Sequence, residues 1–410
     1  NVPVVPIYFH GSNSRLFHLL GQIHPSLRTA KLPSELLNKK NKTIKIRIGN
    51  PISVKEQERF SDIYQYGRYL RAKTYCLDSG IEVKRFFNYT LKSEPKPEAI
   101  AEPQPQTAIE KEINLLRKQN HLFTIKNYSV FCAPTAKIPF ILNELGRLRE
   151  LTFRDVGEGT NRSTDIDEFD LYYYQLVIWD DDEKRIVGGY RIGKGADILS
   201  QYDIRGFYTQ SLFKMSPPFR EILKQSLELG RSFIVKEYQR KPLPLFLLWK
   251  GILYFLLKNP EYRYLIGPVS ISNTYSEKSK ELIIRYIMTH HFDYQKARLV
   301  APRNRFKVTT NDPHLNDALK HIKPDLGSID KFIGDVDQHN SGLPVLLKKY
   351  LGLNAKIIAF NVDPKFNNCV DGLLVLDIYA IPIETLESLS KEMNDLSLLD
   401  RFYHFHDSGH

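Results

Sequence analysis

The chain has 410 residues, of which 42% are hydrophobic and 26% are charged, and this composition excludes a disordered, collagen-like or coiled-coil protein. Lys and Arg number 58 against 47 Asp and Glu, a formal net charge of +11. Such a basic surface suits nucleic acid, an anionic membrane face or an acidic carrier protein as partner. The three cysteines, Cys76, Cys132 and Cys369, are too few and too scattered for a disulfide framework or a Cys-rich zinc site, and they favour a reducing, cytosolic setting.

The N-terminal stretch VPVVPIYF has neither a basic n-region nor a long apolar core, so we expect no signal peptide. It is typical of an interior strand, and we interpret the chain as a fragment or a processed product. The longest apolar run, 243–257, is interrupted by Lys250 and is shorter than the ~20 residues that a membrane span needs. We therefore predict a buried core helix there.

In the first hundred residues, short β-type runs at 4–9 and 43–48 precede a predicted helix over 54–75. Ser53 and Glu56 form a capping-box pattern at the start of this helix. Four prolines fall within 92–106, and we interpret 91–107 as a Pro-rich linker. A further helix is predicted to begin after Thr107.

The rest of the chain alternates strand and helix patterns, which predicts an α/β fold with a mixed sheet flanked by helices. Two strands over 172–179 and 185–193 are predicted to form a hairpin. Helical spacing covers 217–229, 242–257 and 275–290. The remaining predicted strands cover 227–235, 263–271, 356–362 and 372–378.

Charged residues gather over 145–191 and again at 228–231. They are Arg149, Arg154, Asp165, Asp167, Asp170, Arg191, Glu228 and Arg231. A β-bulge at Gly230 would bring Glu228 and Arg231 onto one face of their strand and free a backbone N–H. That geometry suits acyl transfer, because the N–H can bind a thioester carbonyl while a carboxylate takes a proton from an attacking amine. From spacing alone, ordinary ion pairs explain the pattern equally well.

Seven motifs in order resemble the ornithine- and glycine-lipid N-acyltransferases, often named hemolysin-like, and their relatives the acyl-homoserine-lactone synthases. The similarity covers about 125–390. The motifs are FRDVGEGT, DIDEFDLYY, GGYRIG, LELGRSF, YQRKPLPLFLLWKGI, GPVSIS and the stretch from LPVLLKKY to GLLVLDI. The resemblance implies a GNAT-type fold, an acyl group supplied by acyl carrier protein as a phosphopantetheine thioester, and no bound cofactor or metal.

The same resemblance implies roles for individual residues. Glu228 is similar to the family's proposed general base, and Arg231 resembles the partner that fixes its carboxylate. We therefore expect Glu228→Gln to leave folding intact and to lower turnover by about 10²-fold or more. Asp167 and Asp170 resemble an acidic pair that holds the acceptor ammonium or organises the arginines. The residues implied near the acyl donor are Arg149, Phe153, Arg191, Gln239, Arg240 and Lys241.

Residues 1–90 resemble the closing part of a PlsC-type glycerolipid O-acyltransferase, through VPVVPIYF, HPSLRTA and IRIGNPIS. No His in the chain has an Asp five positions later, so the catalytic His-x4-Asp motif of that family is missing. The implied organisation is an N-terminal remnant at 1–90, a linker at 91–107, a GNAT-like domain at 108–395 and a tail at 396–410. Such a fusion resembles the bifunctional aminolipid synthases.

The function so implied is transfer of a fatty acyl group from acyl carrier protein to the amine of ornithine or glycine, on the cytoplasmic face of a bacterial membrane. The implied partners are acyl carrier protein, the amino-acid acceptor and an anionic membrane surface, but not nucleic acid. The alternatives are an inactive acyltransferase-like protein that binds membrane or carrier protein, or a glycerophospholipid O-acyltransferase in a longer chain. The tail residues His404, His406, Asp407 and His410 have spacing that permits a metal, although a polar tail explains them better.

Overall fold

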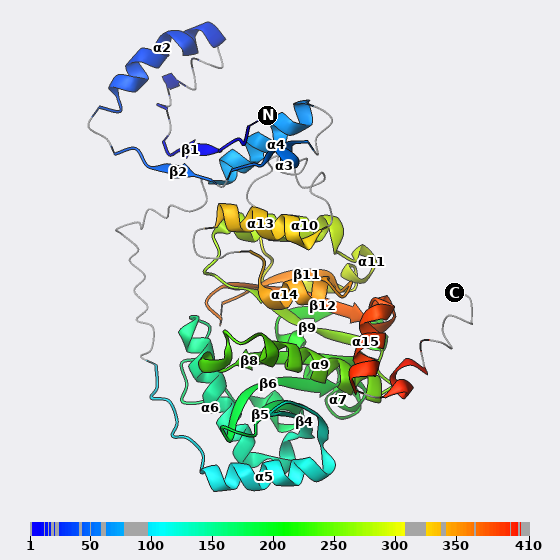
Figure 1. Ribbon diagram of the computed structural model, residues 1–410. Helices are drawn as coiled ribbons and strands as arrows, with labels where there is room; N and C mark the ends of the chain where they lie inside the picture. Colours follow the sequence, from blue (N-terminus) through cyan, green and yellow to red (C-terminus); the bar gives the residue numbers. More distant parts are fainter. Residues whose placement is uncertain are drawn as a thin grey trace. The chain divides into compact units, whose positions relative to one another are not determined.

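The computed structural model describes residues 2–77, 97–307, 325–337 and 342–402, apart from gaps at 12, 15, 18–19, 21–23, 41–42, 50, 59–62, 365, 394 and 401 (Figure 1). The chain divides into two compact units. The first contains 1–86 and also 274–289 and 309–343, two segments that the sequence analysis had placed in the GNAT-like range. The second contains the remaining residues, 87–273, 290–308 and 344–410.

The first unit combines a short hairpin with several helices. Strands β1 (Ile7–Phe9) and β2 (Ile46–Ile48) pair antiparallel. The helices are α2 (Pro25–Leu37), α3 (Val54–Gln57), α4 (Ile63–Cys76), α10 (Glu277–His290, whose last residue belongs to the second unit) and α13 (Leu326–Val336). Ser53 caps α3 by accepting a hydrogen bond from the backbone N–H of Glu56, as predicted. The single helix predicted over 54–75 is wrong, because α3 ends at Gln57 and α4 begins at Ile63.

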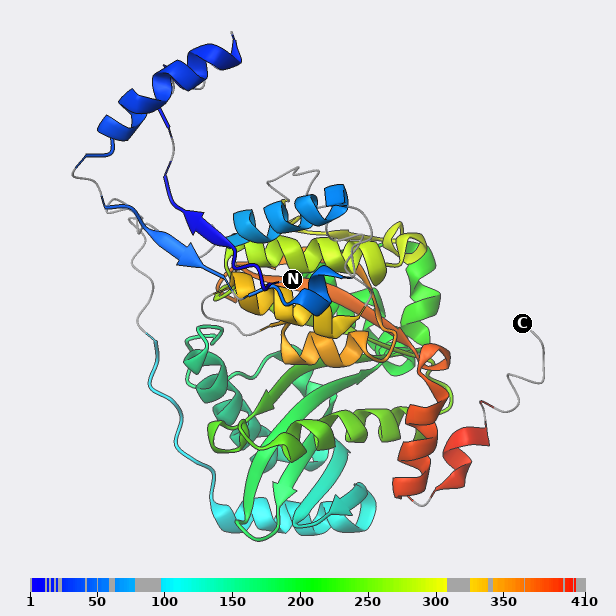
Figure 2. The same ribbon diagram turned by 45° about the horizontal axis from the view of Figure 1, so that its top comes forward.

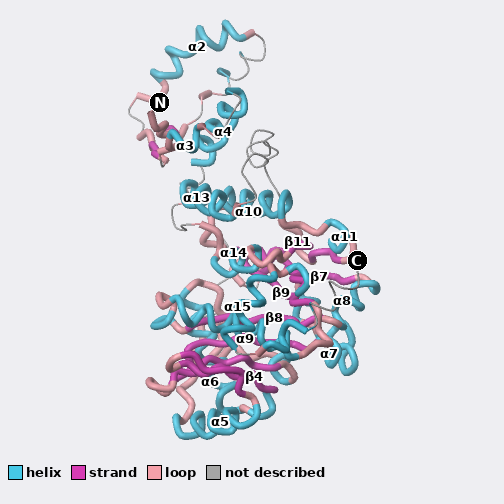
Figure 3. Tube along the Cα trace, turned by 45° about the vertical axis from the view of Figure 1, so that its right-hand side comes forward, coloured by secondary structure: helices cyan, strands magenta, loops and turns pink. Residues whose placement is uncertain are grey.

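The second unit is built on an eight-stranded mixed sheet, which confirms the predicted α/β, GNAT-like fold class (Figure 3). Every neighbouring pair is antiparallel except β8 and β9, which run parallel. The predicted hairpin is present as β5 and β6. In spatial order the strands are β11 (Lys356–Asp363), β12 (Cys369–Asp377), β9 (Tyr264–Ile271), β8 (Ser226–Ile234), β6 (Arg185–Lys194), β5 (Tyr174–Asp180), β4 (Tyr128–Pro134) and β3 (His121–Ile125).

Helices cover both faces of this sheet. Helix α9 (Pro242–Lys258) packs on β3, β4, β5, β6 and β8, and Figure 2 shows it lying across the strands. Helices α6 (Pro139–Asp155) and α7 (Gly195–Tyr202) pack on the opposite face, which carries Arg191. The other elements of this unit are α5 (Gln106–Gln119), α8 (Arg220–Lys224), α11 (Tyr294–Ala297), α14 (Val345–Leu351), α15 (Ile383–Met393) and the small sheet of β7 (Phe213–Met215) and β10 (Val300–Pro302).

Two predictions about helices in this unit have different outcomes. The apolar run at 243–257 is a core helix as expected: Leu247 and Leu256 of α9 are fully buried, and Lys250 is buried against Glu392 of α15. The helix predicted over 217–229 is wrong in length, because α8 ends at Lys224 and β8 begins at Ser226. None of the helices in the described part of the chain is long and apolar enough to cross a membrane.

The sheet opens between its two parallel strands. β8 and β9 pair only from Ser226–Tyr264 to Glu228–Ile266, and beyond that point they separate. β9 stays paired with β12 along its whole length, and β8 stays next to β6. A large apolar core, which includes Tyr173, Phe207 and Ile266, fills the face under α7 and α8. The opening between β8 and β9 is therefore framed by rigid, well-packed strands.

Candidate active site

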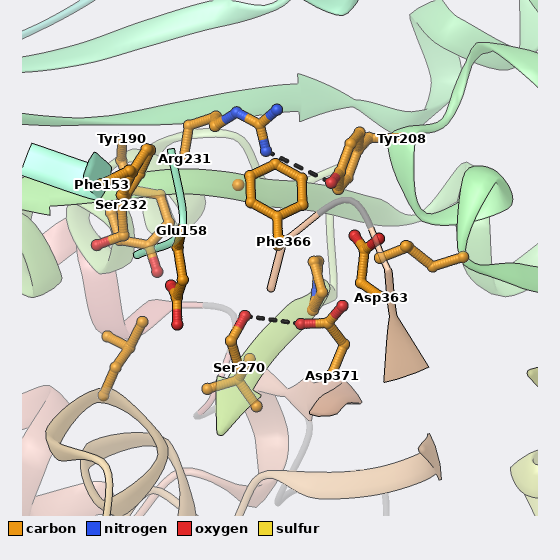
Figure 4. A pocket seen from close by; sticks show the side chains of 15 residues that line it. Phe153, Glu158, Tyr190, Tyr208, Arg231, Ser232, Ser270, Asp363, Phe366 and Asp371 are labelled. Atoms are coloured by element: carbon orange, nitrogen blue, oxygen red, sulfur yellow. Dashed lines mark hydrogen bonds between the residues drawn. The ribbon is translucent and has the colours of Figure 1, made fainter. Parts of the chain in front are cut away.

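A cavity of about 200 Å³ lies in the opening between β8 and β9 (Figure 4). Its wall on β8 is Gly230–Ser232, and its wall on β9 is Pro268–Ser270. Figure 4 shows Arg231 bonded to Tyr208 on one side, and Ser270 bonded to Asp371 on the other. The remaining lining residues are Phe153, Glu158, Tyr190, Leu212, Leu346, Asp363 and Phe366.

β8 carries a bulge at the edge of this cavity, at Arg231 and Ser232, directly after Gly230, where the sequence analysis had predicted it. Gly230 lies opposite Arg191 of β6, but Phe233 lies opposite Gly189, so two residues of β8 face Tyr190 alone. Arg231, inside the bulge, has a φ of +54°, in the left-handed region that costs a non-glycine residue about 1–3 kcal/mol. A bulge leaves its extra residue out of the ladder, so this segment can bind a ligand through its backbone.

Three arginines and three aspartates alternate in a closed ring beside the bulge. In order around the ring they are Arg149, Asp170, Arg191, Asp167, Arg231 and Asp165. Arg149 binds both oxygens of Asp170, at 3.0 and 2.9 Å. Arg231 holds Asp165 at 2.9 Å and Asp167 at 3.3 Å, which fixes the strained bulge. Six members of the predicted charged set are therefore brought together in a network with equal numbers of positive and negative groups. The other two, Arg154 and Glu228, lie outside it, and Arg154 pairs with Glu150.

Asp170 is the most buried member of the ring. Burial alone would raise the pKa of its carboxyl, but the positive charges of Arg149 and Arg191 outweigh burial and hold that pKa well below its ordinary value. Asp167 caps the following 3₁₀ turn, Glu168–Leu171, and accepts from the backbone N–H groups of Phe169 and Asp170. Both aspartates therefore organise arginines and backbone, one of the two roles that the resemblance implied.

Arg191 lies over three aromatic rings. The centre of its guanidinium is 5.3 Å from the ring centroids of Tyr173 and Tyr208 and 5.6 Å from that of Phe169, a cation–π arrangement. Its side chain is 1% exposed. Arg149 and Arg191 do not line the cavity but support its wall, and their place near the acyl donor stays a prediction.

Glu228 is completely buried and its carboxylate is already saturated. Oε1 accepts from the backbone N–H and the hydroxyl of Thr209, at 2.7 and 2.5 Å. Oε2 accepts from the backbone N–H of Tyr208 at 3.0 Å and from the Tyr173 hydroxyl. Burial raises the pKa of Glu228 above its ordinary value, against the lowering effect of these hydrogen bonds.

The predicted pairing of Glu228 with Arg231 is wrong. Arg231 binds Asp165 and Asp167 instead, because the bulge turns its guanidinium toward the ring. Tyr208 links the two residues, because its backbone N–H donates to Glu228 and its hydroxyl accepts from Arg231 at 3.4 Å. Glu228 also does not line the cavity.

Three carboxylates that the sequence analysis did not assign to the site line the cavity: Glu158, Asp363 and Asp371. The pKa of Asp371 is raised to about 7, mainly by burial and further by the charges of Asp363 and Glu158. Burial also raises the pKa of Glu158. The predicted strands 356–362 and 372–378 left Asp371 just outside the sheet, but it lies within β12, between Val370 and Gly372. A carboxylate inside an otherwise apolar strand was the signal for this site.

An apolar groove of about 310 Å³ continues from the bulge along β8 to the loop before α9. It shares Phe153, Glu158, Ser232 and Leu346 with the cavity. The predicted donor residues Phe153, Gln239 and Lys241 line the groove, whereas Arg240 is exposed and does not. A third hollow of about 700 Å³ adjoins the cavity at Tyr208 and Arg231, and Asp167 lines it. The histidines of the tail lie outside the described residues.

Comparisons with known proteins agree with this fold. Residues 148–249, from α6 through the bulge into α9, match the family described as an acetyltransferase (GNAT) domain. That range contains the Arg/Asp ring, Glu228 and the β8 wall of the cavity, whereas the β9 wall, Asp363 and Asp371 lie outside it.

Two curated relatives are both named glycine N(alpha)-acyltransferase. The protein of Bacteroides thetaiotaomicron is 33% identical over 202 residues, which cover 46% of this chain and 59% of the relative. The protein of Phocaeicola vulgatus is 29% identical over 254 residues, 58% of this chain and 76% of the relative. The chain thus spans about three-fifths of the first relative's length.

Among solved structures, the acyl-homoserine-lactone synthase LasI aligns with 39% of this chain and 78% of its own, at 17% identity and a TM-score of 0.27. The CoA-dependent acyl-homoserine lactone synthase BjaI, solved with SAM and isopentyl-CoA, aligns with 58% of this chain and 72% of its own, at 14% identity and a TM-score of 0.24.

Proposed function

We propose that the second unit is an N-acyltransferase that moves a fatty acyl group from acyl carrier protein to the amine of an amino acid and so forms a lyso-aminolipid. The observation that carries the proposal is the β8 bulge, which lies between an apolar groove and a cavity rich in carboxylates. A long acyl thioester suits the groove, and an ammonium group suits the carboxylates. The GNAT match and the names of the two relatives support the same reaction class.

The proposed reaction joins the two substrates at the bulge. The amine nitrogen attacks the thioester carbonyl carbon, and the carbonyl oxygen becomes an oxyanion that backbone N–H groups of the bulge stabilise. The C–S bond then breaks, so an amide forms and the phosphopantetheine thiol leaves. The attacking amine must lose its proton to a carboxylate in the cavity, and one proton returns to the departing sulfur.

Glycine is the acceptor that we favour over ornithine, because both relatives are named for it. A cavity of about 200 Å³ suits a small amino acid held beside an acyl chain. Burial raises the pKa of Glu158 and is the main cause of the raised pKa of Asp371, to which the charges of Asp363 and Glu158 add. A substrate ammonium would supply the positive charge that stabilises these buried carboxylates.

The proposal is tested by thiol release from the purified chain. Acyl and 3-hydroxyacyl carrier protein are the donors, acyl coenzyme A is the comparison donor, and an amino-acid panel contains glycine and ornithine. We expect release that depends on glycine and on the carrier-bound donor, with the N-acyl amino acid identified by mass spectrometry. A folded chain that releases no thiol with any donor and acceptor would contradict the proposal.

A further prediction concerns Lys241 and the binding of the acyl donor. Its ammonium lies 4.2 Å from the centroid of the Tyr238 ring at the end of the groove, where a phosphate of the donor arm would meet it. We expect Lys241→Gln to raise KM for acyl carrier protein about fivefold, the effect of losing one exposed charge contact, with kcat little changed. Steady-state kinetics checks this, with Lys224→Gln, an exposed change on α8, as the matched control. An unchanged KM would exclude Lys241 from the donor path.

For residues 1–90 we propose the closing part of a PlsC-type acyltransferase domain, as the motifs there suggest. In a bifunctional protein such a domain would add the second acyl chain on oxygen. The net charge of +11 supports binding of both acidic carrier protein and the anionic inner face of the bacterial membrane.

A further inference from the structure

We infer that Asp371, and not Glu228, is the general base that takes the proton from the acceptor amine at the bulge. The inference rests on the proposed function and names the residue that performs its proton transfer. It is carried by the register of the sheet, by the hydrogen bonds of the two carboxylates and by the lining of the cavity.

The register of the sheet places Asp371 at the level of the bulge. The last pair between the parallel strands is Glu228 with Ile266. Four residues further along each strand are Ser232 and Ser270, which face the cavity from its two walls. Asp371 pairs with Ser270 across the β9–β12 ladder. An acceptor held between β8 and β9 therefore has the bulge on one side and Asp371 on the other.

The hydrogen bonds of Asp371 leave one oxygen available. Oδ1 accepts from the Ser270 hydroxyl at 2.7 Å and from the Cys369 thiol at 3.6 Å. Within the described part of the chain, no donor is within hydrogen-bonding distance of Oδ2. Ser270 thus orients the carboxylate while Oδ2 can accept a proton. Glu228 has the opposite arrangement, since each of its oxygens already accepts two hydrogen bonds away from the cavity.

The groups around Asp371 set the pKa of its carboxyl at a value that suits a general base. The other ionisable side chains that line the cavity are Glu158, Asp363, Arg231, Tyr208 and Tyr190. The pKa of Asp371 is raised to about 7, because burial and the charges of Asp363 and Glu158 outweigh the lowering effect of the hydrogen bonds from Ser270 and Cys369. Arg231 offsets this little, because Asp165 and Asp167 already neutralise its charge. A base with a pKa near the working pH combines a large deprotonated fraction with a useful affinity for the proton.

The test is Asp371→Asn in the full chain, compared with Asp363→Asn and with Asp182→Asn, an exposed change in the turn after β5. We expect Asp371→Asn to lower kcat at least 10²-fold. The wild-type rate should rise with pH through a midpoint at about pH 7 and then reach a plateau. In Asp371→Asn this pH midpoint of the rate should be absent. Asp182→Asn should keep the wild-type rate and profile.

A second measurement separates catalysis from folding. Because the folded state raises the pKa of Asp371, its contribution to stability is present at low pH and is lost as the pH rises from 4 through 7. The thermal midpoint of Asp371→Asn at pH 8 should therefore equal or exceed that of the wild type. A wild type that transfers acyl groups alongside an equally active Asp371→Asn would overturn this inference alone. So would loss of the pH midpoint in Asp363→Asn only. A folded wild type that transfers to no amine would overturn the proposed function and this inference with it.

Discussion

Replacing Asp170 by Asn is expected to lower the free energy of unfolding by about 3–5 kcal/mol, the cost of removing one partner from a buried ion pair. Asp170 is 0% exposed and accepts from two arginines. Its Oδ1 also accepts from the Gln175 amide at 3.0 Å, and its Oδ2 from the backbone N–H of Asp167 at 3.0 Å. An Asn side chain in either orientation would direct an NH₂ group at other donors and leave the ring with an unbalanced positive charge.

The loss of unfolding free energy in Asp170→Asn should depend on pH. Because Arg149 and Arg191 lower the pKa of Asp170 in the folded state, its contribution to stability is present above its ordinary pKa of 3.8 and is lost as the pH falls below that value. The difference in the free energy of unfolding between wild type and Asp170→Asn should therefore be constant from pH 5 to 8 and become smaller toward pH 2. Denaturant unfolding at several pH values measures it.

Asp155→Asn is the matched control for this substitution. Asp155 forms an ion pair with Lys236 in which the two side chains are 49% and 78% exposed, and such a surface pair contributes at most about 1 kcal/mol. Loss of this ion pair should hardly change the free energy of unfolding. If Asp170→Asn were as mild as Asp155→Asn, the ring would not hold the bulge in place.

The sequence predicted six of the eight strands of the sheet, all except β3 and β4, because strand signals are local. The β5–β6 hairpin follows from two aromatic and β-branched runs around a polar turn, and the bulge follows from Gly230 between Glu228 and Arg231. The partners of Arg231 could not be predicted in the same way. They depend on how a loop that carries Asp165 and Asp167, 66 and 64 residues earlier, folds back over the strand.

The place of Asp371 in the cavity could not be predicted from the local sequence either. The predicted strands 356–362 and 372–378 left it in the connection between them, whereas its proposed function depends on the register between β12 and β9 and on the separation of β9 from β8. Neither quantity has a local sequence signal. The two helix ends that were missed, at Gln57 in α3 and at Lys224 in α8, lie in stretches whose local spacing would continue the helix.

Glu228→Gln is expected to lower the free energy of unfolding by about 2–3 kcal/mol, in contrast to the intact folding that the family resemblance implied. Each Glu228 oxygen accepts a backbone N–H, from Tyr208 on one side and from Thr209 on the other. A glutamine has only one acceptor oxygen, so one of these buried N–H groups must face an NH₂ group. Turnover should fall as well, because Tyr208 then moves and Arg231 loses a partner.

The pH dependence of this variant should run opposite to that of Asp170→Asn. Burial raises the pKa of Glu228, so its contribution to stability is present below its ordinary pKa of 4.5 and is lost as the pH rises through the raised value. The difference in the free energy of unfolding between wild type and Glu228→Gln should therefore become smaller as the pH rises. Glu221→Gln, an exposed change on α8, is the control and should leave unfolding unchanged.

A double-mutant cycle with Thr209→Val decides between positioning and catalysis for Glu228. Thr209 donates to Oε1 through its hydroxyl at 2.5 Å, so the two changes should be coupled in the free energy of unfolding by about 1 kcal/mol. A positioning role predicts this coupling together with an unchanged pH midpoint for the residual activity. Wild-type stability, no coupling and loss of that midpoint would instead make Glu228 the base, and the carboxylate of Asp371 would then serve only to attract the ammonium.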